Sequence, residues 1–166
     1  MYRKWLPDYF YKDIYTIEYE ALWKKGYRGL IFDLDNTICS YSTAKPTIKI
    51  MRFIASLQEM GFQVFIVPNN SRQRVEKFNE DLHLPIMARA QKPLTGAILR
   101  AIKRMGLKKS QVAVVGDQIY TDVWGGNRAG ITTILVEPVE NRESLFFRIK
   151  RALEAPVLEH YQKHGK

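Results

Sequence analysis

The sequence lacks several features that would define its class. Its 166 residues include a single cysteine, Cys39, so an internal disulfide is excluded, and no group of Cys and His has the spacing of a zinc site. No stretch approaches the roughly 18–20 apolar residues of a membrane-spanning helix. The first twelve residues lack the apolar core of a signal peptide. We therefore expect a cytoplasmic protein with one domain, whose 46% hydrophobic residues can form a core.

Charge is distributed unevenly along the chain, which has a net charge of +9. Arg72–Lys109 contains ten Lys and Arg residues against three acids, whereas Ser110–Asn141 contains one against four. A basic block beside an acidic block suits an anionic substrate held near a bound cation. The alternative is an ordinary charge excess that keeps a domain soluble.

Short apolar runs alternate with helical patterns in the middle of the chain. The runs are rich in β-branched residues and predict buried strands. They are Gly29–Phe32, Phe62–Val67, Val112–Val115 and Ile131–Val136, with a weaker candidate at Pro85–Ala88. The helical patterns cover Pro46–Met60, Ser71–Leu82 and Pro93–Met105. This alternation predicts an α/β fold, a doubly wound parallel sheet with helices on both faces and its active site at the carboxyl ends of the strands.

Two terminal segments flank the predicted core of residues 28–140. Residues 1–27 contain nine aromatic residues interleaved with Lys and Arg. Residues 141–166 predict a helix with Leu145, Ile149, Ala152 and Leu153 on one face, next to basic residues.

The pair Asp33 and Asp35 directly follows the first predicted strand. A carboxylate can attack phosphorus and form an aspartyl-phosphate, which divides one difficult step into two easier ones. Asp33 is placed for that role, and Asp35 could protonate the leaving oxygen and then activate water. Two buried like charges are costly without a cation, and Mg²⁺ favours such oxygen ligands. Solvated acids at a strand end are the alternative interpretation.

Two further signals lie later in the chain. Lys92 precedes Pro93 at a predicted helix start and could neutralise a nucleophile and a phosphoryl group. Asp117 follows the strand Val112–Val115 and could complete a metal's carboxylate set. Asp122, five residues on, could bind the metal through water or hold Lys92 in place.

Together these residues resemble the motifs of haloacid dehalogenase (HAD)-like phosphatases. Asp33–Thr37 matches the first motif, DxDx(T/V), Lys92 the third, and the pair Asp117 and Asp122 the fourth. The resemblance covers about Arg28–Val136 and implies that Asp33 is the nucleophile and Asp35 the acid/base. It also implies Mg²⁺ held by Asp33, by the backbone carbonyl of Asp35 and by Asp117, and a phosphate site near Thr37.

The second motif departs from the family pattern. The family has Ser or Thr at the end of the second strand, where this chain has Pro68, which offers neither a hydroxyl nor an N–H. Asn69, Asn70 or Ser71 could bind the phosphoryl group instead. A lost donor of this kind typically costs about 2.7–4 kcal/mol of transition-state stabilisation, so we expect a slower reaction of the same type.

The sequence resembles the YqeG-like group within HAD subfamily IIIA, which is similar to phosphatidylglycerophosphate phosphatases. The matching segments are Leu6–Tyr9, Gly29–Thr37, Asn69-Asn70, Gln91–Pro93, Gly116–Gln118 and Thr121-Asp122. The resemblance implies dephosphorylation of phosphatidylglycerophosphate. Neither interval between motifs has room for a cap domain, so we expect an open site that suits a large substrate.

Several alternatives stay open from the sequence alone. The aromatic and basic segment 1–27, and the basic tail, could contact an anionic membrane, or the aromatics could pack on the sheet. The substrate could be a nucleic-acid end or a phosphoprotein, given the basic block. A phospho-accepting or scaffold module without catalysis could share this fold. The oligomeric state is not indicated by the sequence.

Overall fold

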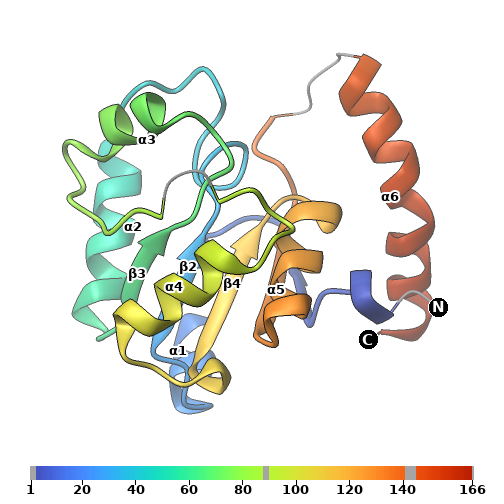
Figure 1. Cartoon of the computed structure of the whole chain (residues 1–166), viewed down its shortest axis with the longest axis horizontal. Helices are drawn as coiled ribbons and strands as arrows, with labels where there is room; N and C mark the ends of the chain where they lie inside the picture. The colour runs from blue at the N-terminus through green and yellow to red at the C-terminus, as the bar shows by residue number, and fades with distance from the viewer. Residues whose placement is uncertain (1–2, 88–89, 141–144, 166) are drawn as a thin grey trace.

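The computed structural model describes residues 3–87, 90–140 and 145–165 (Figure 1). The strands are β1 (Tyr9–Tyr11), β2 (Gly29–Phe32), β3 (Gln63–Ile66), β4 (Val112–Gly116) and β5 (Thr132–Val136). The α-helices are α1 (Tyr19–Lys24), α2 (Ile48–Glu59), α3 (Arg72–Asn79), α4 (Gly96–Met105), α5 (Trp124–Ala129) and α6 (Leu145–His164). The short helices are η1 (Arg3–Trp5), η2 (Lys109–Gln111) and the π-helical turn η3 (Ile119–Val123).

The five strands form one parallel sheet in the order β1-β5-β4-β2-β3. Strand β2 lies at the point where the connections reverse direction, because β3 is its neighbour on one side and β4 on the other. Ligands of doubly wound sheets bind at the carboxyl ends of strands at such a point. The residues that directly follow β2 and β4 therefore meet at this edge.

Helices cover both faces of the sheet (Figure 1). On one face, apolar residues of α1, α2 and α3 pack on alternate side chains of β2, such as Leu30 and Phe32. On the other face, α4 and α5 pack on Ile31 and Val114. Successive side chains of a strand point to opposite faces of the sheet. Because helices cover both faces at β2 and β4, the sequences of these strands are apolar throughout.

The four stronger strand predictions are confirmed to within one residue at each end. The weaker candidate, Pro85–Ala88, contributes an isolated bridge between Ile86 and Ile66, and Ala88 lies outside the described residues. The three internal helices are confirmed with shorter bounds. Strand β1 was not predicted from the sequence, because three aromatic residues in a basic segment carry no clear strand period.

The aromatic N-terminal segment packs against the rest of the protein. Tyr19 is buried, and Trp23 and Tyr27 pack on the core formed with α2. Trp5 and Phe10 pack on a smaller core with η3, β5 and α6. Packing on the core thus involves these side chains, as the alternative interpretation expected; the membrane contact of this segment stays a prediction, and Tyr2 lies outside the described residues.

Helix α6 runs along one end of the molecule, next to η1 (Figure 1, red). A helix is confirmed here, and two residues of the predicted apolar face point to solvent: Ile149 is 54% exposed and Leu153 is 59% exposed. Glu154 and Val157 are buried instead. Within the described ranges, none of the helices combines the length and apolar character needed to cross a membrane.

The connections after the first two core strands are short. Residues 33–47 join β2 to α2, and residues 67–71 join β3 to α3. In the described residues between β2 and α4, only α2, β3 and α3 intervene as regular elements. The edge of the sheet that carries the site is therefore free of a cap domain in this part of the chain.

Candidate active site

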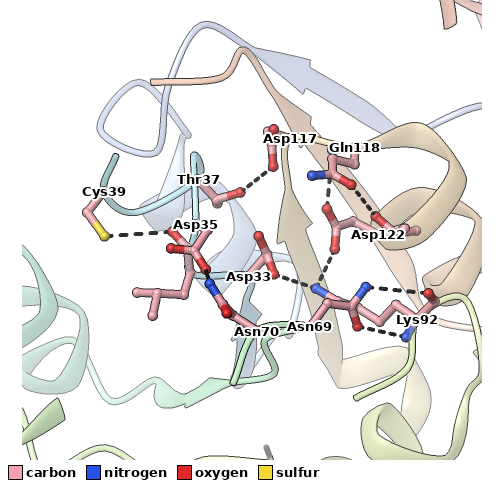
Figure 2. A network of polar contacts seen from close by, with 12 residues as sticks. Asp33, Asp35, Thr37, Cys39, Asn69, Asn70, Lys92, Asp117, Gln118 and Asp122 are labelled. Atoms are coloured by element: carbon pink, nitrogen blue, oxygen red, sulfur yellow. Dashed lines mark hydrogen bonds and ion pairs between the residues drawn. The ribbon is translucent and has the colours of Figure 1, made fainter. Parts of the chain in front are cut away.

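Four polar side chains converge at the carboxyl ends of β2 and β4 (Figure 2). Asp33 is the first residue after β2, and its backbone N–H donates to the carbonyl of Val115 in β4 at 2.9 Å. Asp117 follows β4 directly, and Asp122 lies in the turn η3. Lys92 reaches the same point from the segment before α4, so three connections of the sheet supply the cluster.

The Lys92 ammonium bridges two buried carboxylates. Its Nζ lies 2.6 Å from Asp33 Oδ1 and 2.6 Å from Asp122 Oδ1, and the lysine side chain is 1% exposed. Asn69 fixes the lysine backbone, since its Oδ1 accepts from the Lys92 N–H at 2.8 Å and its Nδ2 donates to the Lys92 carbonyl at 3.4 Å. The lysine is thus held at both its main chain and its ammonium.

Three acids, Asp33, Asp117 and Asp122, form a group suited to a divalent cation. One carboxylate oxygen from each lies within 4.8 Å of the others. Three negative charges against the one positive charge of Lys92 leave the cluster at −2, and hard oxygen donors of this kind are what Mg²⁺ prefers. The donor set and its charge both fit such an ion.

Gly116 makes the close approach of Asp122 possible. A Cβ added at this position would lie 2.2 Å from Asp122 Cγ, which is far inside van der Waals contact. The Asp122 carboxylate is further held by the Gln118 N–H, which donates to Oδ2 at 3.2 Å. Any other residue at position 116 would push Asp122 away from Lys92.

Electrostatics of the cluster favour an additional positive charge. Burial raises the pKa of the Asp33 carboxyl above its ordinary value, although the Lys92 ammonium opposes that shift. Burial disfavours the charged form of Lys92, but Asp122 and Asp33 outweigh this and raise its pKa. Lys92 therefore stays protonated, and the acids still have more negative charge than it can balance.

The Asp35 carboxylate points away from this cluster (Figure 2). Asn70 Nδ2 donates to its Oδ2 at 2.7 Å, and the guanidinium of Arg74 forms an ion pair with its Oδ1. The predicted metal contact of Asp35 uses its backbone carbonyl and stays a prediction. Its carboxylate is outside the three-acid group.

The loop that follows β2 is closed by Thr37 and Asn36. The Thr37 hydroxyl donates to Asp117 Oδ1 at 3.1 Å, so it orients one acid of the cluster. Asn36 has a φ of 64° and exchanges two hydrogen bonds with the backbone of Glu140, which ties the loop to the segment after β5. Asn tolerates this left-handed conformation better than most residues.

The residues predicted to replace the missing phosphate donor have other partners. Asn69 binds the Lys92 backbone and Asn70 binds Asp35, as described above. Ser71 is exposed at the start of α3, and its backbone N–H donates to Asn70 Oδ1 at 2.6 Å. Pro68 is buried, and its carbonyl accepts from the Ala90 N–H. The Asn69-Asn70 pair therefore supports Lys92 and Asp35.

Two residues that support the site were not predicted from the sequence. Arg74 belongs to the basic block, but no spacing rule connects it to Asp35. Glu154 of α6 is buried and accepts from the Ile119 N–H at 3.0 Å, so the terminal helix supports the turn that carries Asp122. A buried acid on an otherwise apolar helical face is the signal that could have indicated this contact.

Comparisons with known proteins identify the family of the chain. A family model described as HAD-hydrolase-like matches residues 89–148. The "Probable phosphatase YqeG" of Bacillus subtilis is 39% identical over 160 residues, covering 96% of this chain and 93% of that protein. "Phosphatidylglycerophosphate phosphatase 1, chloroplastic/mitochondrial" of Arabidopsis thaliana is 27% identical over 175 residues; the match covers 96% of this chain but 49% of that protein.

Solved structures share the fold. The D,D-heptose 1.7-bisphosphate phosphatase of B. bronchiseptica, solved with magnesium and phosphate, is 17% identical with a TM-score of 0.58, over 76% of this chain and 86% of that one. The HAD-hydrolase YfnB of Bacillus subtilis has a TM-score of 0.56 at 17% identity, over 74% and 92%. From the extent and identity of the match to the Bacillus subtilis protein, the chain belongs to the HAD-like phosphatases of the YqeG group.

Proposed function

We propose that this phosphatase is a Mg²⁺-dependent phosphomonoester hydrolase that works through an aspartyl-phosphate on Asp33. The observation that carries the proposal is the buried bridge of Lys92 between Asp33 and Asp122 beside Asp117. Asp33 is held there against the strand end, with its carboxylate 2.6 Å from the Lys92 ammonium. A nucleophilic carboxylate needs nearby positive charge to approach an anionic phosphoryl group, and Lys92 together with a bound cation would supply it.

The reaction we propose has two displacements at phosphorus. Asp33 attacks the phosphorus, the bond to the leaving oxygen breaks, and that oxygen takes a proton from Asp35. Water then attacks the same phosphorus and gives its proton to Asp35, while the bond to Asp33 breaks and inorganic phosphate leaves. Each displacement restores the group that the other consumed.

Mg²⁺ would be held by the carboxylates of Asp33 and Asp117 and by the Asp35 carbonyl, with Asp122 beside it. When bound, the ion would neutralise the phosphoryl oxygens as negative charge shifts during transfer. Lys92 would contribute its ammonium to the same oxygens and keep Asp33 oriented. Thr37 would act through Asp117, whose carboxylate its hydroxyl orients.

We propose phosphatidylglycerophosphate as the substrate. The relatives named for this activity support the choice, as does the absence of a cap among the described residues, because a lipid headgroup at a membrane cannot be enclosed. A phosphoprotein or a nucleic-acid end is the second candidate, favoured by the basic block Arg72–Lys109. A scaffold role without catalysis would leave Lys92 and its two acids without a chemical purpose.

We propose α6 as the surface for a peripheral membrane contact. Ile149 and Leu153 project to solvent one turn apart, and Arg148 beside them is exposed. Apolar side chains next to a basic residue suit the surface of an anionic bilayer. The wild-type protein should float with vesicles that contain phosphatidylglycerol, and a variant with both residues changed to Ser should not. Unchanged flotation of the variant would show that this face of α6 does not bind the membrane.

A substrate panel tests the function directly. Phosphate release should be measured from phosphatidylglycerophosphate in mixed micelles, nucleotides, sugar phosphates and a phosphopeptide, with Mg²⁺ or with EDTA. We expect Mg²⁺-dependent release, highest for the lipid. The variant Asp33→Asn should be inactive, whereas the exposed control Asp81→Asn should match the wild type. Release in EDTA, or from Asp33→Asn, would contradict the proposal.

A further inference from the structure

Arg74 of α3 reaches across the site and binds three points of the loop that follows β2. Its Nε donates to Asp35 Oδ1 at 2.7 Å, and its Nη2 lies 2.5 Å from the same oxygen. Its Nη1 donates to the carbonyl of Thr43 at 3.0 Å, and its Nη2 to that of Ser40 at 3.1 Å. The arginine side chain is 19% exposed, so these contacts are largely shielded from water.

Hydrogen bonds from Arg74 and Asn70 hold both carboxylate oxygens of Asp35. Arg74 binds Oδ1 and Asn70 binds Oδ2, and the Asp35 side chain is 8% exposed. Without these donors, an acid two residues from Asp33 would be drawn to the same positive charge as the neighbouring carboxylates. Arg74 and Asn70 therefore separate Asp35 from the cluster around Lys92 and fix the direction of its carboxylate.

The contacts with the two carbonyls add a second constraint. They fasten the segment 40–43 to the guanidinium that also binds Asp35, so the loop and the carboxylate have a common anchor. A planar guanidinium presents five donors in a fixed fork and can satisfy such diverging acceptors at once. A lysine ammonium at the same position has fewer donors and no fork, so it could keep the charge but not the whole arrangement.

We propose that Arg74 is a positioning residue for proton transfer: with Asn70 it keeps the Asp35 carboxylate apart from the cluster around Lys92, so that this carboxyl serves the leaving oxygen and not the cation. This inference rests on the acid/base role proposed for Asp35. It predicts that loss of Arg74 is selective for the substrate. A leaving group that departs as a stable anion needs no proton, whereas an alkoxide does.

The test compares kcat/KM for p-nitrophenyl phosphate and for the alkyl ester glycerol 1-phosphate. kcat/KM reports the steps up to transfer of the phosphoryl group to Asp33, so slow hydrolysis of the phosphoenzyme does not mask the effect. A misplaced catalytic group can cost about 100-fold. We expect Arg74→Met to lose about 100-fold on glycerol 1-phosphate and little on p-nitrophenyl phosphate, with Asp35→Asn showing the same selectivity.

Arg72→Met is the matched control. Arg72 lies two residues earlier on α3, and its partner is Glu76 on the same exposed helix face. We expect it to leave both substrates unchanged. If Arg74→Met fails to fold, Arg74→Lys keeps the charge and the stem; it should show the same selectivity with a smaller loss.

The double variant Arg74→Met/Asp35→Asn should lose no more than Asp35→Asn alone, because one residue acts through the other. Equal losses on both substrates, additive losses in the double variant, or a change in KM alone would overturn the positioning role. Full activity of Arg74→Lys on both substrates would overturn it too. If Asp35→Asn loses activity equally on both substrates, the proposed acid role of Asp35 fails. If Asp35→Asn is selective for glycerol 1-phosphate but Arg74→Met is not, only the role of Arg74 fails.

Discussion

Replacement of Lys92 by Met should destabilise the metal-free protein strongly. The change keeps an apolar stem but removes an ammonium that lies 2.6 Å from each of two carboxylates, in a site where lysine, Asp33 and Asp122 side chains are 1%, 9% and 2% exposed. Removal of one partner from a buried ion pair typically costs about 3–5 kcal/mol, because the other charge is left uncompensated. We expect a loss of this size in the free energy of unfolding.

Mg²⁺ should recover much of that loss. Without Lys92, the three acids have a net charge of −3 instead of −2, so a divalent cation gains more from binding them. Ligand at 100 times its Kd adds about 2.7 kcal/mol to folding stability. Urea unfolding followed by tryptophan fluorescence, in EDTA and in Mg²⁺, should therefore show a larger Mg²⁺ effect in Lys92→Met than in the wild type.

Lys45→Met provides the control for this experiment. Lys45 pairs with Glu80 at 4.0 Å, and both side chains are more than half exposed, at 58% and 62%. Such a surface pair contributes about 0–1 kcal/mol. Equal stabilities of Lys92→Met and Lys45→Met in EDTA, or an equal response of Lys92→Met and wild type to Mg²⁺, would refute the charge balance described for this site.

Three further predictions concern residues around the cluster. Burial raises the pKa of the Cys39 thiol to about 12, so iodoacetamide at pH 8 should alkylate it on the order of 1,000-fold more slowly in the folded protein than in urea, by mass spectrometry; equal rates would show an accessible thiolate. Glu154→Ala should cost about 1–3 kcal/mol in thermal or urea unfolding, because the buried Ile119 N–H loses its acceptor, and an unchanged stability would show that α6 does not support this turn. Pro68→Ser should preserve kcat/KM or raise it, by up to about 100-fold if the new hydroxyl binds the phosphoryl group, whereas a large drop would mean that this loop works differently.

The sequence predicted the core of the fold because its elements follow local rules. Apolar runs without alternation indicate strands buried on both faces, and all four strong candidates are strands of the parallel sheet. The acids and Lys92 could be placed together for the same reason, since the carboxyl ends of parallel strands meet at one edge. Asp33 and Asp117 directly follow their strands, so their grouping depends on chain order and strand direction.

Other features depend on how whole elements pack, which no local pattern encodes. Strand β1 exists because Tyr9–Tyr11 lie beside β5, with Asp8 binding the backbone and hydroxyl of Thr133. The buried face of α6 does not follow from apolar character, because Ile149 and Leu153 are more apolar than Glu154, yet Glu154 has the buried hydrogen-bond partner. Arg74 reaches Asp35 only because α3 lies over the loop 40–43.

The central claim is that Asp33 takes the phosphoryl group from the substrate. The most direct test is to mix the enzyme with Mg²⁺ and p-nitrophenyl phosphate, quench in acid within milliseconds, reduce with borohydride and map the peptides by mass spectrometry. Reduction converts an aspartyl-phosphate to homoserine, so we expect homoserine at position 33 and at no other aspartate. Homoserine at another aspartate, or normal turnover with no modification at Asp33, would show that Asp33 is not the nucleophile.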